Sequence, residues 1–397
     1  MSDDVSNDLM VDIFERLPLK SIIRFRSLSK YWHSRIASPE FIRNHSLRCS
    51  KNPPKLLIKH HTYCGNLEFK DIYTLHPVDQ LPLDSSSGYI RIPGVEFPHG
   101  TKEVIGSCNG ILCLRDNGSY ISLWNLSIRR ELIVPRVPCL NYLSSMALGF
   151  GFDPITDDYN LVAICYNKYG SDGINAFVYS LKTDSWRATP SPSTWLKDVK
   201  SNACFFNGIL HWVVDGYLTE PSPEERKRPI RFIFTFDLNT HVCGHILLPR
   251  PWRVEQLTTI NGCLVAVSFE HGNNWKIRVM KEYCNIESWS VLFEFQAEAF
   301  DVIRVFQAVN DGDIVAYYNG SSVYNLQTRL LMKLLKFGPY CFNLKMETYA
   351  ENLELLDKER ATTCGETIFS WTKEDDHKRI RLSQGLDDEC LVLNYTF

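Results

Sequence analysis

The spacing of apolar residues changes once along this chain of 397 residues. In residues 5–48 the spacing is helical: Leu9, Ile13 and Leu17 recur at i, i+4 and i+8 and place an apolar stripe on one face. From Lys55 onward, apolar and polar residues alternate in short runs, which is the pattern of half-buried strands. The pattern therefore predicts a small helical module followed by a long all-β region.

Prolines divide the helical segment into three predicted helices. Pro18 ends the first, because the residue before a proline avoids the α region. The second helix carries Ile22 and Leu28, and the third carries Trp32 and stops near Pro39. A segment this short buries little surface by itself. Its apolar residues exceed what three short helices need, so we expect a partner to cover some of them.

The β region is built from short apolar runs separated by turn residues. The clearest runs are LLIKHH, ILCL, NLVAIC, AFVYSL, ILHWVV, FIFTFDL, CLVAVSF and DIVAYY. Pairs that favour tight hairpin turns with positive φ occur at Asn109-Gly110, Asn207-Gly208, Asn261-Gly262 and Asp311-Gly312. Many short strands with regular turns predict a sandwich, a barrel or a propeller.

A repeated phrase favours the propeller. An aromatic residue leads each of YTLHP, WNLSIR, YSLKTD, FDLNTH and YNLQTR, at steps of 51, 55, 57 and 88 residues. The segment WKIRVMKE at 275–282 fills the widest step. This gives about six four-stranded units between Lys55 and Leu356, with the period of about 50 residues that is typical of kelch-like blades. The predicted fold is a small all-α module followed by an all-β propeller of about six blades.

The pattern predicts that the first unit, which starts at Lys55, lacks its innermost strand. An open first blade would leave unpaired strand edges, so we expect a carboxy-terminal strand to pair with it. The best-placed candidate is ENLELL at 351–356, and LVLNYTF at the carboxy terminus is the second.

The helical segment resembles the F-box, the module that docks substrate receptors onto the Skp-type adaptor of cullin-RING ubiquitin ligases. The matching elements, in order, are Asp8-Leu9, Ile13-Phe14, Leu17-Pro18, Lys20-Ser21, Arg24-Phe25-Arg26, Lys30, Trp32 and Ser38-Pro39-x-Phe41. The chain departs from the family at Val5-Ser6, where Leu-Pro is usual, and at Ser29, where Cys is usual. The residues expected to bind the adaptor are Asp8, Leu9, Ile13, Phe14, Leu17, Pro18, Ile22 and Leu28. The alternative is a small helical cap that packs on the rest of the chain.

The β region resembles the F-box-associated domain of plant F-box proteins, a group that includes kelch-like and S-locus F-box proteins. The phrases GSCNGILCL, GFGFDPITDDYNLV, NGILHWVV and FDLNT carry the resemblance over roughly residues 100–356. The expected domains are an F-box at 1–48, a linker at 49–54, the propeller at 55–356 and a charged tail at 357–397.

Composition narrows the class of partner. Lys and Arg number 43 and Asp and Glu number 46, for a net charge of −3, which disfavours general nucleic-acid binding. The first fifteen residues contain no basic residue, unlike a secretory signal, and no apolar stretch is long enough to span a membrane. We expect an intracellular protein, in cytoplasm or nucleus, whose thirteen cysteines are free thiols.

Catalytic motifs are missing from the sequence. It contains no GxSxG, HExxH, P-loop or Cys-x-x-Cys motif, so we expect neither an enzyme nor a cofactor. His241, Cys243 and His245 share one face of a predicted strand, which could hold a metal. We expect this face instead to point outward or to pack against a neighbouring blade.

The lengths and positions of the loops predict which face of the propeller binds a target. The tight turns share one face, because successive strands alternate in direction. The opposite face carries the longer, more variable loops, and aromatic anchors in such loops are typical of recognition surfaces. The candidate residues are Tyr142, Tyr169, Trp195, Tyr217, Trp252 and Trp275. The alternative is that several of them fold back and seal the blades.

The resemblance implies a substrate-recognition subunit of an SCF-type ubiquitin ligase. The F-box would bind the Skp-type adaptor and, through it, cullin, while the propeller would hold a target protein that the sequence does not name. Two alternatives stay open: an F-box scaffold that acts outside a ligase, and a propeller enzyme with a helical cap.

Overall fold

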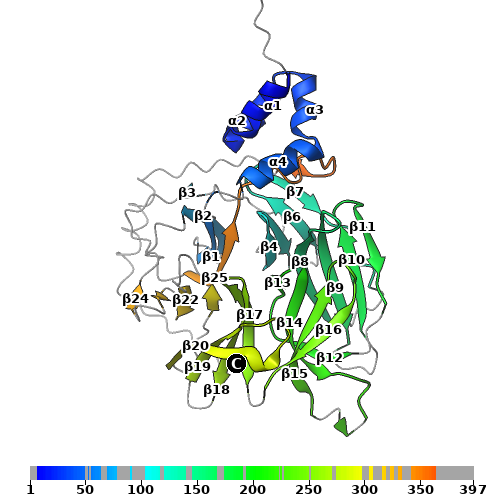
Figure 1. Cartoon of the computed structure of the whole chain (residues 1–397), viewed down its shortest axis with the longest axis vertical. Coiled ribbons are helices and arrows are strands. Elements are labelled where there is room, and N and C mark those ends of the chain that lie inside the picture. The colour runs from blue at the N-terminus through cyan, green and yellow to red at the C-terminus, as the bar shows by residue number, and fades with distance from the viewer. Residues whose placement is uncertain are drawn as a thin grey trace, which may run out of the picture.

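A computed structural model describes most of the chain (Figure 1). The described residues are 7–49, 52, 55–63, 69–77, 90–91, 103–116, 120–139, 145–167, 174–190, 194–222, 224–225, 228–249, 252–270, 274–296, 304–306, 315–318, 322–325, 330–332 and 341–363.

The amino-terminal module contains four helices rather than the three predicted. They are α1 (Asn7–Glu15), α2 (Leu19–Phe25), α3 (Lys30–Ile36) and α4 (Pro39–Cys49). The sequence analysis took Pro39 only as the end of a helix. Pro39 is instead the first residue of α4, where the missing N–H of a proline costs nothing. Ser29, which stands where the F-box family usually has Cys, caps α3 by accepting a hydrogen bond from the Trp32 amide at 3.2 Å.

Aromatic rings fill the centre of this helical module. Phe14 stacks on Phe25 with ring centroids 4.9 Å apart and contacts Trp32 at 4.5 Å. Ile22 and Ile36 are fully buried beside them. These side chains form the centre of the core of the module.

The rest of the described chain forms six antiparallel sheets, which are the blades of a propeller. Blade 1 contains β1 (Lys55–Tyr63), β2 (Phe69–Pro77), β3 (Ile90–Arg91) and β25 (Cys341–Tyr349). Blade 2 contains β4 (Glu103–Cys108), β5 (Ile111–Arg115), β6 (Ile121–Asn125), β7 (Arg130–Ile133) and β26 (Thr362–Thr363). Blade 3 contains β8 (Ser145–Asp153), β9 (Asp158–Tyr166), β10 (Asn175–Ser180) and β11 (Ser185–Ala188).

The other three blades follow the same order. Blade 4 contains β12 (Trp195–Val199), β13 (Cys204–Phe206), β14 (Ile209–Tyr217), β15 (Ile230–Asp237) and β16 (Cys243–Leu247). Blade 5 contains β17 (Arg253–Ile260), β18 (Cys263–Glu270), β19 (Asn274–Met280) and β20 (Trp289–Gln296). Blade 6 contains β21 (Arg304–Phe306), β22 (Val315–Tyr318), β23 (Ser322–Asn325) and β24 (Leu330–Met332). The prediction of a small helical module followed by a propeller of about six blades is confirmed.

The predicted turns lie where the repeats placed them. Asn109-Gly110 and Asn261-Gly262 join the first two strands of blades 2 and 5, and Asn207-Gly208 joins β13 to β14 in blade 4. All six residues have positive φ. Asp311-Gly312 lies outside the described residues. The repeated aromatic phrases begin in the third strand of their blades.

A carboxy-terminal strand closes the ring, as expected, but it is not the predicted one. β25 pairs antiparallel with β1, with Tyr349 opposite Lys55. The segment ENLELL at 351–356, expected to be this strand, contains no strand, and its residues 354 and 355 lie in a turn. The apolar pattern of this segment reflects burial of its leucines against other parts of the protein and not the alternation of a strand. The second candidate, LVLNYTF, lies outside the described residues.

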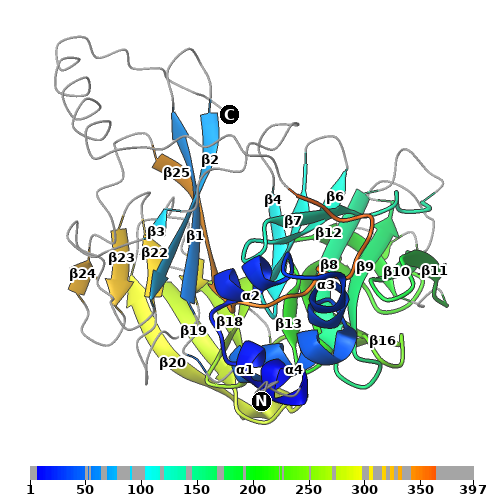
Figure 2. The same ribbon diagram turned by 90° about the horizontal axis from the view of Figure 1, so that it is seen from above.

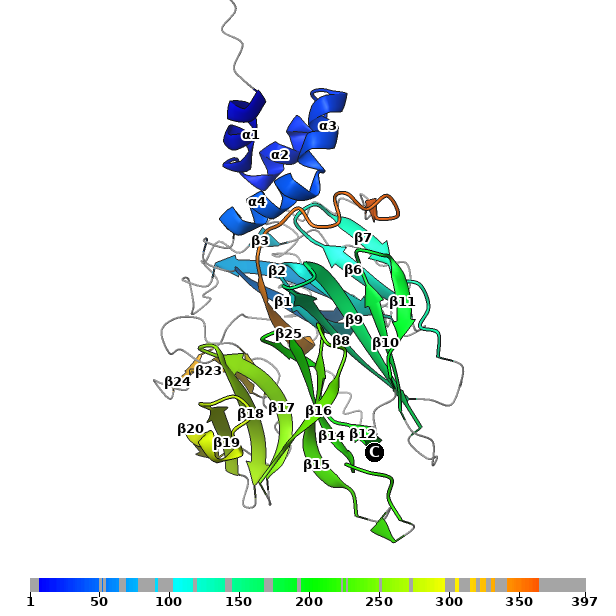
Figure 3. The ribbon, with the colours of Figure 1, turned by 45° about the vertical axis from the view of Figure 1, so that its right-hand side comes forward.

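Residues 351–363, here called the strap, lie between the helices and the propeller (Figure 3). Leu353 and Leu356 are buried in one cluster with Phe14 and Ile22 of the helical module. Ile128, in the turn between β6 and β7, packs against the same cluster. The strap therefore completes the core of the helical module and joins it to blade 2.

Polar contacts hold the strap on blade 2. Asn125 donates from Nδ2 to Oδ1 of Asn352 at 2.6 Å and to the carbonyl of Glu354 at 2.7 Å. Asn352 donates in turn to the carbonyl of Asn109, in the first tight turn of the blade. Asn125 and Asn352 are both almost fully buried. Buried amides that satisfy each other in this way fix one position of the strap.

The start of the expected charged tail, residues 357–397, is part of this structure. Arg130 donates to the carbonyl of Lys358 at 2.8 Å, and β26 pairs with β7. Arg360 forms an ion pair with Asp184, in the turn between β10 and β11. Residues 357–363 therefore pack on blades 2 and 3, and residues 364–397 lie outside the described part.

One carboxylate of the strap makes stability depend on pH. Glu354 is half-buried, and burial, together with the nearby charge of Asp357, raises its pKa to about 7. A raised pKa contributes stability that is complete below the unfolded pKa and is lost as pH rises through the folded value. Between about pH 4.5 and 7 this group therefore lowers the free energy of unfolding as pH rises.

We expect Glu354→Gln to remove this slope, because glutamine carries no charge to desolvate. Near pH 8 the variant should be about 1–3 kcal/mol more stable than the parent, and at acidic pH the two should converge. Thermal unfolding across this pH range measures the difference. Glu359→Gln, an exposed position in the same strap, is the control and should keep the parental slope. A Glu354→Gln variant that keeps it as well would contradict the assignment.

The helices lie over the tight-turn ends of blades 2 and 3. Arg43 of α4 forms an ion pair with Asp157, in the turn between β8 and β9, at 2.5 Å. Figure 1 shows the four helices above the sheets, and Figure 2, seen from above, shows them in front of the sheets. We call the opposite side, at which β5, β9, β14 and β18 end, the far face. Among the described residues, no helix is long and apolar enough to cross a membrane.

Candidate recognition surfaces

The helical module exposes large apolar side chains. Leu9 and Ile13, one turn apart on α1, are 53% and 41% exposed. Leu28, before α3, is 60% exposed, and Tyr31 on α3 is 49% exposed. So many exposed apolar side chains on so small a module are typical of a surface that a partner covers.

Two of the predicted adaptor-binding residues are not on this surface. Phe14 is 3% exposed and Ile22 is 0% exposed, since both belong to the core of the helical module. The helical spacing placed both residues on an apolar face, but it did not show whether that face packs in the core or binds a partner. Asp8 and Pro18 are exposed, and Leu17 is half-buried. Tyr31, which the sequence analysis missed, stands next to the Trp32 that it singled out.

Ion pairs clamp α1 to α4. Asp12 accepts hydrogen bonds from Arg16 at 2.7 Å and from Arg48 at 2.8 Å, and the Arg16 bond is the main cause that lowers its pKa. Glu15 is buried beside them and accepts from Asn44 at 3.0 Å. These contacts hold Leu9 and Ile13, on the same helix, in a defined position.

The predicted aromatic residues of the propeller separate into two groups. Trp195 and Tyr217 are half-buried cross-strand neighbours at the far-face ends of β12 and β14. Trp275 is only 8% exposed and packs against Phe269, so it helps to seal blade 5.

Trp252 also serves blade packing. It lies against the core between blades 4 and 5, at 5.9 Å from Trp289, and the Arg278 guanidinium lies 4.0 Å from its ring centroid. Trp252 and Trp275 therefore both contribute to packing within or between blades, as the sealing alternative describes. Tyr142 and Tyr169 lie outside the described residues.

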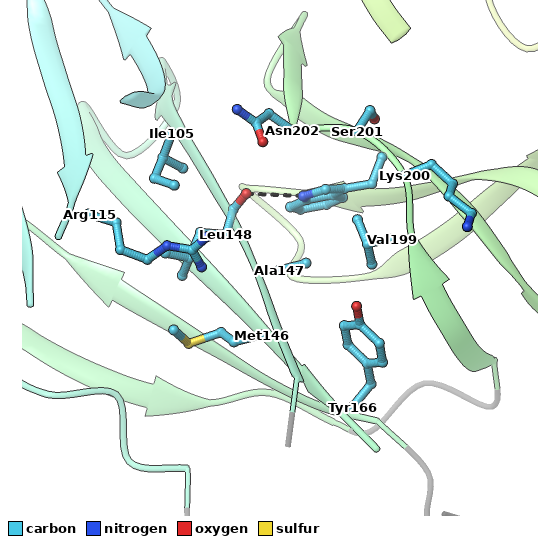
Figure 4. A pocket seen from close by; sticks show the side chains of 11 residues that line it. Ile105, Arg115, Met146, Ala147, Leu148, Tyr166, Val199, Lys200, Ser201 and Asn202 are labelled. Atoms are coloured by element: carbon cyan, nitrogen blue, oxygen red, sulfur yellow. Dashed lines mark hydrogen bonds between the residues drawn. The ribbon is translucent and has the colours of Figure 1, made fainter. Parts of the chain in front are cut away.

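A pocket of about 160 Å³ lies where blades 2, 3 and 4 meet (Figure 4). Irregularities in two inner strands help to form it. A bulge in β4 places Ile105, and the inner strand of blade 4 is interrupted between β12 and β13. Its lining residues are Ile105, Arg115, Met146, Ala147, Leu148, Tyr166, Val199, Lys200, Ser201, Asn202 and Trp212.

The pocket lies toward the far face. Arg115 ends β5, Tyr166 ends β9 and Met146 is near the start of β8. These are the strand ends opposite the tight turns that contact the strap and α4. Sequence reasoning missed this site because its residues come from three blades and no repeated phrase marks them.

Comparison with known families agrees with this architecture. The F-box domain matches residues 3–44, and the F-box associated beta propeller domain matches residues 89–323. The chain belongs to the F-box proteins with an associated propeller. This pairing of domains is that of a substrate adaptor.

Relatives of the F-box protein come from Arabidopsis thaliana. An F-box/kelch-repeat protein is 25% identical over 332 residues, which cover 80% of this chain and 86% of the relative. The F-box protein CPR1 is 26% identical over 324 residues, which cover 73% of this chain and 72% of the relative. Among solved structures, an oligogalacturonate lyase in complex with manganese has a TM-score of 0.41 and 11% identity, over 67% of this chain and 72% of that one.

Two thiols of the F-box protein are packed inside blade 2. Cys108 and Cys113 are buried in blade 2, and burial raises the pKa of the Cys108 thiol to about 12. Within the described residues, no three His, Cys, Asp or Glu side chains are grouped as metal ligands. The sequence analysis placed His241 in one strand with Cys243 and His245. In the structure, His241 has positive φ and precedes β16, which begins at Cys243.

Proposed function

We propose that this F-box protein is the substrate receptor of an SCF-type ubiquitin ligase. The exposed apolar residues of α1 and of the α2–α3 region would bind the Skp-type adaptor, and through it cullin. The far face would bind the target protein, inside the cell. The observation that carries the proposal is the position of the helices, which occupy the tight-turn side and leave the far face to a partner.

In this role the chain performs no chemistry itself. It would hold a target at a defined distance from the enzyme that carries ubiquitin, which raises the effective concentration of the two. The strap supports such a role, because it joins the adaptor-binding module and the propeller through a shared core rather than through a free linker.

The adaptor interface can be tested with charged substitutions. We expect the double variant Leu9→Asp and Ile13→Asp to bind a Skp-type adaptor at least about 30-fold more weakly, because buried interface anchors typically contribute 2 kcal/mol or more. Thermal unfolding should change little, since both side chains are exposed. Co-purification and calorimetric titration with the adaptor measure the two effects.

Leu47→Asp is the matched control. Leu47 is 61% exposed on α4, on the same module. It should retain adaptor binding. Undiminished binding by the double variant, or an equal loss by the control, would refute the assignment of the interface to α1.

A further inference from the structure

The far-face pocket has a basic lining. Two of its lining residues, Arg115 and Lys200, are basic, and no acidic residue lines it among the described residues. The carboxylates that pair with them lie outside the lining. Arg115 donates to Glu103 at 2.6 Å, and Lys200 donates to Asp198 at 2.6 Å.

The two cations are placed differently. Figure 4 shows the Arg115 guanidinium and the Tyr166 hydroxyl turned toward the middle of the lining residues, whereas the Lys200 chain runs outward. Lys200 also approaches Asp215, at 3.4 Å, so its charge is shared between two carboxylates. Arg115 is therefore the cation that faces an incoming group.

Arg115 retains donors for a ligand. A guanidinium has five N–H groups in a rigid fork, and Glu103 is the hydrogen-bonded partner of Arg115 among the residues that the structure describes. The fork suits planar or tetrahedral anions, which accept two parallel hydrogen bonds.

The remaining walls suit the stem of a side chain. Met146, Leu148 and Trp212 supply apolar surface, and the Trp212 indole is held by a hydrogen bond to the Leu148 carbonyl at 3.1 Å. A volume of about 160 Å³ holds several water molecules, and therefore one side chain, but not a folded element.

We propose that this pocket binds one anionic side chain of an acidic peptide segment in the target protein. The anion bonds to the Arg115 guanidinium, and the methylene stem lies against Met146 and Trp212. This assignment rests on the proposed receptor function and names the chemistry of the target. The anionic group is a carboxylate or a phosphate, and the experiment separates these two sources.

The test uses the full chain, expressed with and without a Skp-type adaptor, and three pools of short fluorescent peptides. The pools are degenerate except at a central position, which is Glu, phosphoserine or Gln. Fluorescence anisotropy should show the Glu or the phosphoserine pool binding about tenfold or more tightly than the Gln pool. The better of the two anionic pools identifies the source of the anion.

Three variants give the pocket a distinct signature. Arg115→Met keeps the stem but removes the charge, and should abolish the preference for anionic pools. Arg136→Met is the control: Arg136 follows β7 toward the same face, donates to the Tyr120 hydroxyl and does not line the pocket, so the preference should persist. Glu103→Gln removes the competing carboxylate and should tighten anionic binding several-fold, which a misfolded protein could not do.

The possible results separate the two proposals. Equal binding of all pools, no binding at about 1 mM, or a preference that survives Arg115→Met overturns the pocket assignment. If the unmodified chain does not co-purify with the adaptor, the receptor function is overturned instead. The preference for anionic peptides can then still be measured with the chain expressed without adaptor.

Discussion

Gly110→Ala is expected to destabilise the protein by about 3 kcal/mol or more, whereas Gly208→Ala should cost about 1 kcal/mol. Both glycines are the second residue of an Asn-Gly turn, with φ of +81° and +77°. An added Cβ is strained at either position. At Gly110 it would also overlap the Ala350 carbonyl and the Asn352 side chain of the chain that runs over this turn, while at Gly208 it meets nothing within 4 Å.

Urea denaturation of the two variants, compared with the parent, measures the difference. The turn conformation is common to both positions, so the excess loss at Gly110 reports the contact with the strap and its entry. The side chains of Asn125 and Asn352 are buried and hydrogen-bonded to each other, so Asn352 cannot easily move away from an added Cβ. Equal losses at the two glycines would show that the strap does not press on blade 2 as the structure describes.

Truncation after Ala350 is expected to have an even larger effect. The truncated variant keeps β25, so the ring can close. It lacks the strap, which contains the buried residues Leu353, Leu355 and Leu356. A buried leucine contributes roughly 1.5–3 kcal/mol, so the loss is about 5 kcal/mol or more, comparable with the stability of a whole domain. We expect the helical module to unfold and its exposed core to promote aggregation.

Truncation after Thr363 is the matched control, because it leaves every described contact of the strap in place. Limited proteolysis between α4 and β1, followed in time, and scanning calorimetry distinguish the two chains. The shorter chain should be cut faster and should lose the cooperative unfolding of helices and propeller. A chain ending at Ala350 that resists protease like the parent would show that the strap is not part of the helical core.

Local patterns were enough to predict the elements and their order. Apolar residues spaced by four gave helices, and alternation gave strands, because each element must turn one face to a core. The Asn-Gly pairs located three tight turns, since few other residues adopt positive φ at low cost. The regular step between the aromatic phrases predicted the propeller, and the incomplete first unit predicted a closing strand.

Only the tertiary structure decided which partner buries each apolar run. The leucines of ENLELL look like a strand in sequence, yet Leu353 and Leu356 pack into the core of a helical module more than 300 residues earlier in the chain, and Leu355 packs between blades 2 and 3. In the same way, Phe14 and Ile13 are neighbours in sequence, but the first faces the core and the second faces solvent. The far-face pocket arises where three blades meet at a bulge and a strand interruption. Burial depends on contacts between distant segments, and periodicity describes only the segment itself, so these features have no local signature.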